Sequence, residues 1–556
     1  MAGDLTARFD LTIQRVLTGG PPVFDDAFIL ADAAPHHVRR FTEYSGDVSG
    51  RYLDAFAAAS RQTGRRFPSL DRLLTKVISL QKTDGHFGDP MSTGKVVDGD
   101  LALLWGNGRM LVGLLECYHL TARSDVLESA RRLGDFLVDV APRFNADDVR
   151  REYSGPKFAA GYICWTNNLE GVVELYRVTR DDRYLALARQ IAVRIHRHPS
   201  QHSHGLLTTL RGVVALYRAT GERGYLEQAH AEWQGIIDSG NLFVQGAVPE
   251  LLAPEPPRDE GCSEADWLRL SLELWQLTRR PEYLRQAQVT LFNEFAFNQF
   301  HTGDFGHHAL SWHGVEPRFA RAWWCCTFHG LRAMAAAFGY AFSEQDGALL
   351  YDLPIDGRGH AIGLTVSADA SLNRTASVRL TIQQADLRPH TLSLRVPEWA
   401  SQVTLSLAGR ALPAEPRGDY LSVTRAWKAG EIVTAAYRFR TRLVPHPKIE
   451  GRTAVFYGPW LLAVDEAASP NYFDETSSQN KVDLAASGGD FKLEPVSPPP
   501  ASAPFTVPVA HFKLRYLPAG YPVQPQSALL RPMAEFTAEP DNSRLEFWLP
   551  IALKKD

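Results

Sequence analysis

The N-terminal two thirds of this 556-residue chain contains an internal repeat, which restricts the fold more than any single motif. In four segments an aromatic residue is followed at +3, +9 and +12 by threonine, leucine and alanine. The apolar positions recur every three or four residues, as on one face of a helix. The copies are Tyr118-Thr121-Leu127-Ala130, Tyr176-Thr179-Leu185-Ala188, Tyr217-Thr220-Leu226-Ala229 and Trp275-Thr278-Leu284-Ala287. Each copy therefore predicts a hairpin of two helices.

The number and spacing of these hairpins indicate a closed ring. The copies stand 58, 41 and 58 residues apart, so the connections between hairpins are unequal. Residues 47–63 and 68–82 predict another helix pair, and 327–343 predicts a last helix, which brings the total close to twelve. The repeats of an open solenoid would be spaced more evenly. We therefore expect an (α/α)6 barrel, with its long connections at one rim around a pocket.

After about residue 347 the pattern changes to β-rich segments separated by Gly, Pro and Asp turns. The segments 378–382, 391–396, 403–407 and 432–437 predict an antiparallel β-sandwich. The expected fold is thus a multidomain α and β protein, with the helical barrel first and the sandwich after it. The expected domains are a catalytic barrel at 1–346, a sandwich at 347–484, a Pro/Ser-rich linker at 485–504 and a short β-rich segment at 505–556.

The composition excludes several classes of protein. With a net charge of −4, the chain shows no basic surface for nucleic acid or an anionic membrane. The first residues lack the apolar core of a signal peptide, and no apolar run reaches the length needed to span a bilayer. Five cysteines in so long a chain do not make a disulfide framework, so a cytoplasmic location is expected.

Three of the five cysteines gather around one carboxylate in the sequence. Glu260-Gly261-Cys262 is followed 63 residues later by the pair Cys325-Cys326. Zinc binds thiolates together with carboxylate oxygens, and a bound metal would keep the thiols deprotonated. Free cysteines are also common as small buried apolar residues. The spacing alone does not decide between these two interpretations.

Together with E-x-C and C-C, several other stretches resemble glycoside hydrolase family 127, the bacterial β-L-arabinofuranosidases. The resemblance covers roughly residues 38–465. The stretches are Gln81-Lys-Thr-Asp84-Gly85-His86-Phe87, Trp105-Gly-Asn-Gly108-Arg109, Glu260-Gly-Cys262-Ser263, Cys325-Cys326, Leu394-Arg-Val-Pro397-Glu-Trp399, Gly418-Asp-Tyr420, Trp427-Lys-Ala-Gly430-Glu and Gly458-Pro459-Trp460-Leu461.

The resemblance implies a zinc ion, held by Glu260, Cys262, Cys325 and Cys326. It further implies that Cys325 is the nucleophile and that an upstream glutamate, Glu250, is the general acid/base. Attack by sulfur at the anomeric carbon, followed by attack of water, retains the configuration. The implied function is that of a retaining exo-glycosidase. It would release a terminal β-L-arabinofuranoside, or a related pentose or deoxysugar, from an oligosaccharide or glycoside.

The chain departs from the family pattern around the substrate. Thr327-Phe328-His329-Gly330 stands where the family has P-x-N, and Phe305-Gly306-His307-His308 replaces its F-x-Y-type segment. The interval from Glu250 to Cys262 is shorter than in the family, so Glu255 competes for the acid role. Sugar hydroxyls need fixed donors and acceptors, and sugar rings stack on aromatic faces. The residues expected to bind substrate are His86, Trp105, His204 and His307.

Two other functions stay open at this point. A sugar epimerase or an unsaturated-uronide hydrolase would use the same barrel, with His or Asp chemistry and no need for a cysteine cluster. A non-catalytic carbohydrate-binding protein would keep zinc for structure and bind sugar without turnover. The expected partners are the glycoside substrate and, as a further option, a second copy of the chain in a homodimer.

Overall fold

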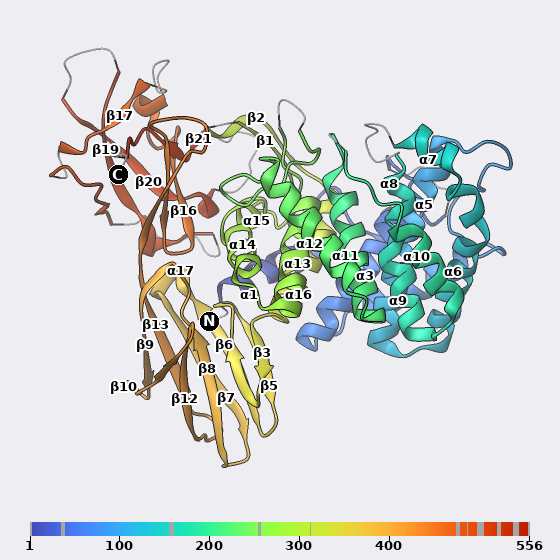
Figure 1. Ribbon diagram of the computed structural model, residues 1–556, viewed down its shortest axis with the longest axis horizontal. Helices are drawn as coiled ribbons and strands as arrows, with labels where there is room; N and C mark the ends of the chain where they lie inside the picture. Colours follow the sequence, from blue (N-terminus) through green and yellow to red (C-terminus); the bar gives the residue numbers. More distant parts are fainter. Residues whose placement is uncertain are drawn as a thin grey trace.

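The computed structural model describes residues 3–553 except 35–38, 155–160, 199, 254–256, 312, 474–478, 486–487, 498–504, 520–523 and 537–543, and leaves out the side chains of 317–319. The helices gather at one end of the molecule and the strands at the other (Figure 1). No described helix combines the length and the apolar character needed to cross a bilayer.

The helical part is a closed ring of inner helices surrounded by an outer layer. Each inner helix contacts the next in the order α3, α5, α9, α11, α13, α16, and α16 returns to α3. The inner helices are α3 (Asp47–Thr63), α5 (Asp98–Thr121), α9 (Leu169–Thr179), α11 (Ser203–Thr220), α13 (Gly261–Thr278) and α16 (Trp324–Phe338). The expected (α/α)6 barrel is confirmed by this closure.

The outer layer contains the second helix of each hairpin. Its members are α4 (Pro68–Leu80), α6 (Ser124–Phe144), α10 (Asp182–Ala192), α12 (Arg223–Asp238) and α14 (Pro281–Phe292). The twelfth helix, which the repeat did not predict, is α1 (Asp4–Thr18); it packs on α16, with the rings of Phe9 and Phe338 5.4 Å apart. Shorter helices are α2 (Asp26–Leu30), α7 (Asp147–Tyr153), α8 (Ile163–Thr166), α15 (Glu294–Phe297) and α17 (Leu372–Thr375).

The repeated residues form the turn of each hairpin. The repeat threonine donates its hydroxyl to the carbonyl four residues earlier and accepts from the backbone N–H two residues later, as Thr220 does with Leu216 and Glu222. The next residue, such as Gly221, has a positive φ, and its N–H caps the carbonyl of the repeat aromatic residue. The repeat alanines are fully buried between the layers. The repeat in the sequence thus corresponds to the same helix-ending turn in four hairpins.

The sandwich consists of two sheets packed face to face, in which neighbouring strands are antiparallel with one exception. One has the order β10-β9-β13-β7-β6-β5 and the other β11-β12-β8-β4-β3, with β4 and β8 parallel. The strands are β3 (Phe342–Gln345), β4 (Ala348–Tyr351), β5 (Gly357–Ala361), β6 (Leu364–Ser371), β7 (Ser377–Ala385), β8 (Pro389–Arg395), β9 (Ala400–Leu407), β10 (Arg410–Ala411), β11 (Glu415–Arg417), β12 (Tyr420–Ala426) and β13 (Ile432–Phe439).

A third sheet joins the end of the chain to the barrel. Its main path is β1-β2-β21-β16-β20-β19-β17, so a hairpin inserted before α16 pairs with strands more than 200 residues later. The strands are β1 (Gly306–Leu310), β2 (Gly314–Ala322), β14 (Thr441–Pro445), β15 (Thr453–Tyr457), β16 (Trp460–Asp465), β17 (Lys481–Val482), β18 (Glu494–Pro495), β19 (Phe512–Leu517), β20 (Gln526–Pro532), β21 (Leu545–Glu546) and β22 (Trp548–Leu549). Strand pairing therefore groups β14–β16 with the C-terminal segment, and β18 lies within the expected linker, of which 486–487 and 498–504 lie outside the described residues.

Candidate active site

Three cysteines meet where two inner helices begin. Cys262 lies in the first turn of α13, and Cys325 and Cys326 lie in the first turn of α16. Their sulfur atoms are all within 4.8 Å of one another, and Cys262 Sγ is 3.7 Å from Cys326 Sγ. A helix N-terminus carries a partial positive charge that favours a thiolate. The convergence of two N-termini thus makes this end of the barrel suited to ionised sulfur.

Gly261 permits this convergence. A Cβ at this position would lie 2.7 Å from Asn298 Oδ1 and 3.0 Å from the Cβ of Cys326, so there is no room for a side chain. The glycine of E-x-C therefore allows α13 to approach α16 closely enough for the sulfurs to meet.

The donor set fits a zinc ion. Two thiolates on one tetrahedral zinc, each at roughly 2.3 Å from the metal, stand about 3.8 Å apart, close to the observed separation of Cys262 and Cys326. Glu260, the N-cap residue of α13, has a carboxylate oxygen within 4.8 Å of Cys326 and of His307. His307 Nδ1 donates to the carbonyl of Asp259 at 2.9 Å, which leaves Nε2, 4.0 Å from Cys326 Sγ, as an acceptor. Glu260 and His307 both stand where a fourth ligand is needed.

Cys325 is the cysteine best placed to react. All five cysteines are free, and only Cys325 is partly exposed. Hydrogen bonds from the thiols of Cys262 and Cys326, together with the charge of Arg51, hold the pKa of Cys325 well below its usual range. Arg51 Nη1 lies 3.6 Å from Cys262 Sγ, so the charge directly faces the thiols. Cys325 is therefore the sulfur that ionises first.

A chain of buried polar groups holds Arg51 in place. Arg51 Nη2 lies 2.7 Å from His204 Nε2, which must accept because arginine only donates. His204 Nδ1 then carries the hydrogen and donates to Asp266 at 2.7 Å. Burial and the charge of Arg51 lower the pKa of His204 to about 4, so it is neutral. Asp266 also lies 2.9 Å from Nε2 of His329, in the segment that departs from the family pattern.

Glu250 lies in a loop fixed across the start of α11. Its N–H donates to the carbonyl of Arg258, and its carbonyl accepts from the N–H of Ser203. The carboxylate lies within 4.8 Å of ligand atoms of His202 and Glu260, and the side chain is 5% exposed. Burial, and then the charge of Glu260, raise the pKa of Glu250. An ion pair with Arg258 opposes this shift, but that guanidinium is partly exposed and burial outweighs it.

The four residues expected to bind substrate are placed very differently. Trp105 lines the site, with its ring 5.6 Å from that of His202 and 5.3 Å from that of His204. His307 is part of the cluster described above. His204 has both nitrogens engaged, so it positions Arg51 and has no free donor for a sugar. His86 lies outside the cluster: its nitrogens contact Asp84 and Asp89, and its ring packs on Phe136 of α6.

Other site residues carried no clear signal in the sequence. Arg51 is 211 positions from Cys262, and the only local hint is its ion pair with Asp47 one helical turn earlier. His202, the N-cap residue of α11, has Nε2 3.4 Å from the carboxylate of Glu260, whereas the sequence had pointed to His204. Glu255, the competing acid, lies outside the described residues.

An aromatic group borders the partly exposed thiol. Trp323, the N-cap residue of α16, and Trp324, its first residue, stack with their ring centroids 4.4 Å apart. Phe41 packs against both and is itself 39% exposed. Partly exposed aromatic rings at the start of α16 are the kind of surface on which the apolar face of a sugar stacks.

Comparison with known proteins places this arrangement in a family. Residues 29–338 match the profile of the β-L-arabinofuranosidase GH127 catalytic domain, and residues 355–439 match that of the GH127 middle domain. None of the curated proteins compared with the chain matched it.

Solved structures agree on the fold over nearly the whole length. A glycoside hydrolase superposes with a TM-score of 0.73 at 17% identity, covering 100% of this chain and 96% of that chain. A GH127 β-L-arabinofuranosidase from Geobacillus stearothermophilus has a TM-score of 0.73 at 15% identity, with 99% of each chain covered. A GH127 β-arabinofuranosidase has a TM-score of 0.68 at 17% identity, covering 98% of this chain and 92% of that chain. At these identities the likeness concerns the fold, whereas the catalytic profile spans more than half of the chain. The chain therefore belongs to the β-L-arabinofuranosidase family GH127 and is a glycoside hydrolase.

Proposed function

We propose that this protein is a retaining exo-glycosidase that uses Cys325 as nucleophile and Glu250 as general acid/base. The observation that carries the proposal is the meeting of three thiols at two helix N-termini, with Cys325 alone partly exposed. Family membership supports hydrolysis of a glycosidic bond in a carbohydrate substrate. The thiol cluster supports the choice of sulfur over a carboxylate pair.

Zinc is the proposed cofactor, bound by Glu260, Cys262, Cys325 and Cys326. When bound, it would keep these thiols ionised near neutral pH. The protein itself supplies further stabilisation of the thiolate through Arg51 and the two helix N-termini. His307 Nε2 is a fifth candidate donor, because its lone pair faces the same cluster.

The proposed reaction has two displacement steps. Sγ of Cys325 forms a bond to the anomeric carbon while the bond to the leaving oxygen breaks, and the carboxyl group of Glu250 donates its proton to that oxygen. Glu250, now a carboxylate, removes a proton from water as the water oxygen attacks the anomeric carbon. The carbon–sulfur bond breaks in the same step and the thiolate is restored. Two inversions retain the configuration.

The proposed substrate is a terminal β-L-arabinofuranoside or a related pentose or deoxysugar. Two solved relatives of similar fold bear the name β-L-arabinofuranosidase or β-arabinofuranosidase, which supports a furanoside. Trp105 and His307 line the site and are proposed to contact the sugar, with His202 as an addition. The segment from Thr327 to Gly330 differs from the family pattern, and His329 in it turns inward to Asp266. The sugar preference is therefore to be sought in a panel of several pentosides and deoxyhexosides.

Labelling of the nucleophile tests this proposal. A substrate analogue with an electrophilic anomeric carbon should attach to Cys325, as peptide mapping would show, and metal analysis of protein purified without chelator should give about one zinc per chain. Cys262→Ala should lose the metal, whereas Cys117→Ala, at a buried cysteine outside the cluster, should keep both metal and labelling. A label found on a carboxylate would overturn the cysteine mechanism. A fully active, metal-free preparation would overturn the zinc assignment, and zinc with sugar binding but no turnover would favour a non-catalytic protein.

A further inference from the structure

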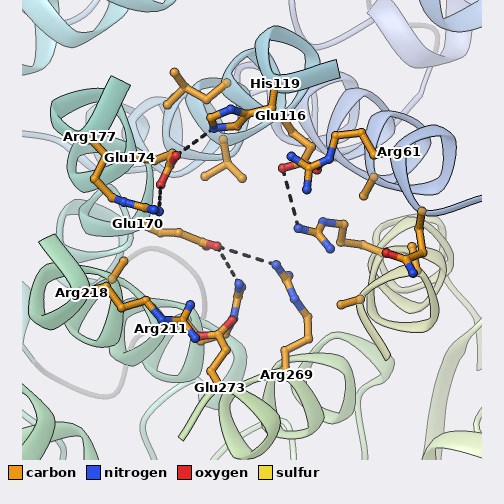
Figure 2. A pocket seen from close by; sticks show the side chains of 18 of the residues that line it. Arg61, Glu116, His119, Glu170, Glu174, Arg177, Arg211, Arg218, Arg269 and Glu273 are labelled. Carbon is orange, nitrogen blue, oxygen red and sulfur yellow. Dashed lines mark hydrogen bonds and ion pairs between the residues drawn. The ribbon is translucent and has the colours of Figure 1, made fainter. Parts of the chain in front are cut away.

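The barrel has a second mouth, at the opposite end from the cysteines, and this mouth contains a cavity of about 470 Å³ (Figure 2). All six inner helices line it, and Arg61 of α3, Arg177 of α9 and Arg218 of α11 come from the last turns of their helices. Along α13, the lining residues Arg269 and Glu273 are seven and eleven residues from Cys262, or about 10 and 16 Å at 1.5 Å per residue. The cavity is therefore separate from the thiol cluster, and its volume is within the range of small-molecule sites, roughly 300–1,000 Å³.

Arginines dominate the lining of this cavity. Six line it: Arg61, Arg177, Arg211, Arg218, Arg269 and Arg332. The lining carboxylates are four: Glu116, Glu170, Glu174 and Glu273. Behind the wall, Asp54 pairs with Arg332, Asp266 pairs with Arg211, and Arg109 adds a guanidinium to Glu170. With these included, seven guanidiniums still face six carboxylates, so the described groups leave positive charge uncompensated.

The position of three of these arginines at helix ends accounts for their presence, whereas the other three are not at helix ends. Arg61, Arg177 and Arg218 lie in the last turns of their helices, where a cation offsets the negative end of the helix dipole. Arg211, Arg269 and Arg332 lie in the interior of α11, α13 and α16, where that effect has faded. We call these three arginines the floor of the cavity. Their positive charge is not explained by the helix dipole.

Arg269 is the least compensated of the floor residues. It is 3% exposed, yet among the described residues its guanidinium reaches carboxylates only at 3.6 Å (Asp266) and 3.8 Å (Glu170), which are beyond hydrogen-bond distance. Glu170 is already paired more closely with Arg211, at 2.9 Å. Burial, and then the guanidiniums of Arg211 and Arg332, lower the pKa of Arg269 to about 10. At the rim, Arg218 donates to the neutral Gln276, and the described residues include no carboxylate paired with it.

We propose that this second mouth is a binding site for a small oxyanion, namely the carboxylate or phosphate group of a sugar-sized molecule. Figure 2 shows the side chains of Arg211 and Arg269 pointing into the centre of the ring, with Arg218 at its edge. A planar guanidinium binds a carboxylate or a phosphate through paired hydrogen bonds, which neutral sugars cannot match. The proposal does not rest on the glycosidase mechanism, although Asp266 contacts both Arg211 of this cavity and His204 of the thiol site.

Calorimetric titration of the full chain tests this site. The probes are inorganic phosphate, glucuronate and, as the uncharged match of glucuronate, glucose, all at one ionic strength set with sodium chloride. We expect saturable binding of phosphate, glucuronate or both, and none of glucose. Binding of only one charged probe identifies which oxyanion the site takes. Absence of saturable binding of either, or equal binding of glucose, overturns the proposal.

Matched variants connect any binding to the cavity. Arg218→Gln and Arg269→Gln should each weaken binding about 10–100-fold, as expected for loss of a charged hydrogen-bonding partner. Arg223→Gln makes the same charge change at an exposed position of α12 outside the cavity and should bind as the wild type does. Arg269 is buried and Arg218 is exposed. If Arg269→Gln does not fold, Arg218→Gln still tests whether the anion binds in this cavity. Unchanged binding in Arg218→Gln, and in Arg269→Gln where it folds, places the anion elsewhere. Cys325→Ser should bind normally whatever its glycosidase activity.

Discussion

One buried guanidinium, that of Arg51, faces the thiols and takes part in setting their charge. Replacing it in Arg51→Gln removes a positive charge, so the pKa of Cys325 should rise and less thiolate should be present near neutral pH. The measurement is the rate of alkylation of Cys325 against pH in metal-free protein, whose midpoint should move to higher pH. Arg51→Lys keeps the charge and should stay closer to the wild type. An unmoved midpoint in a folded Arg51→Gln protein would show that the thiols and helix ends alone set this pKa.

Glu250 is suited to donate a proton because burial and Glu260 raise its pKa. The carboxyl stays protonated to higher pH than an ordinary glutamate, and kcat/KM should fall as pH rises through this pKa. Glu250→Gln should lose that dependence and slow substrates with poor leaving groups by about 10²–10⁴-fold. Activated aryl glycosides should suffer less in the first step, and azide should restore turnover. If Glu255→Gln behaves in this way and Glu250→Gln resembles the wild type, the acid is Glu255.

At the scale of elements, the hairpin turns depend on one residue in the left-handed region. Gly221 ends α11 with φ 75° and open space around its Cα, whereas Ala122 ends α5 at φ 54°. Gly221→Ala should lower the free energy of unfolding by about 1 kcal/mol, and Ala122→Gly should raise it by about 0.5 kcal/mol, reduced by the greater freedom of glycine in the unfolded chain. Denaturant titration measures both. Gly224→Ala, in α12 with open space and no positive φ, should not destabilise, and a similar loss there would remove the turn explanation.

At the scale of the whole molecule, a buried ion pair fastens the third sheet where the β1–β2 hairpin joins it. Arg452 Nη1 lies 2.6 Å from Glu546 Oε1, and Glu546 pairs in register with Gly314 of β2 and Val464 of β16. Arg452→Met removes the charged partner of this buried carboxylate, which keeps only the hydrogen bond from the hydroxyl of Tyr472 among the described residues. Loss of the charged partner costs about 3–5 kcal/mol. Denaturant unfolding of Arg452→Met, compared with the double variant Arg452→Met/Glu546→Gln, measures this cost.

The loss in Arg452→Met should depend on pH. Burial already raises the pKa of Glu546, and without Arg452 the folded protein should hold a proton that the unfolded chain releases. Stability of the variant should therefore fall as pH rises above the ordinary range of a glutamate, and recover at lower pH. The double variant Arg452→Met/Glu546→Gln should lack this dependence and regain most of the stability. Equal losses in the single and double variants would mean that the charge of Glu546 is not the cause.

Local patterns in the sequence were sufficient to predict the helical barrel and the identity of the thiol cluster. The repeat predicts hairpins because the threonine, the residue after it and the buried alanine act within one turn or one helix face, at offsets visible in the sequence. E-x-C and C-C each place their donors side by side because each motif lies at the start of one helix. Their spacing left open whether the cysteines bind a metal or are buried apolar residues, and the resemblance to GH127 favoured the metal. The twelfth helix was missed because α1 carries none of the repeat residues and joins the ring only by packing on α16.

The tertiary structure decided which polar groups surround the thiols and what they can do. Closure of the ring brings the beginnings of α3, α11, α13 and α16 together, so Arg51 reaches Cys262 over 211 residues of chain and His204 becomes a neutral link between Arg51 and Asp266. Pairing of β2 with β21 likewise joins segments more than 200 residues apart. Such contacts depend on how elements pack, and packing leaves no periodicity in the sequence around either partner. The sequence by itself determined the elements and the donor atoms, whereas their mutual orientation, and with it the charge on each group, came only from burial in the closed barrel.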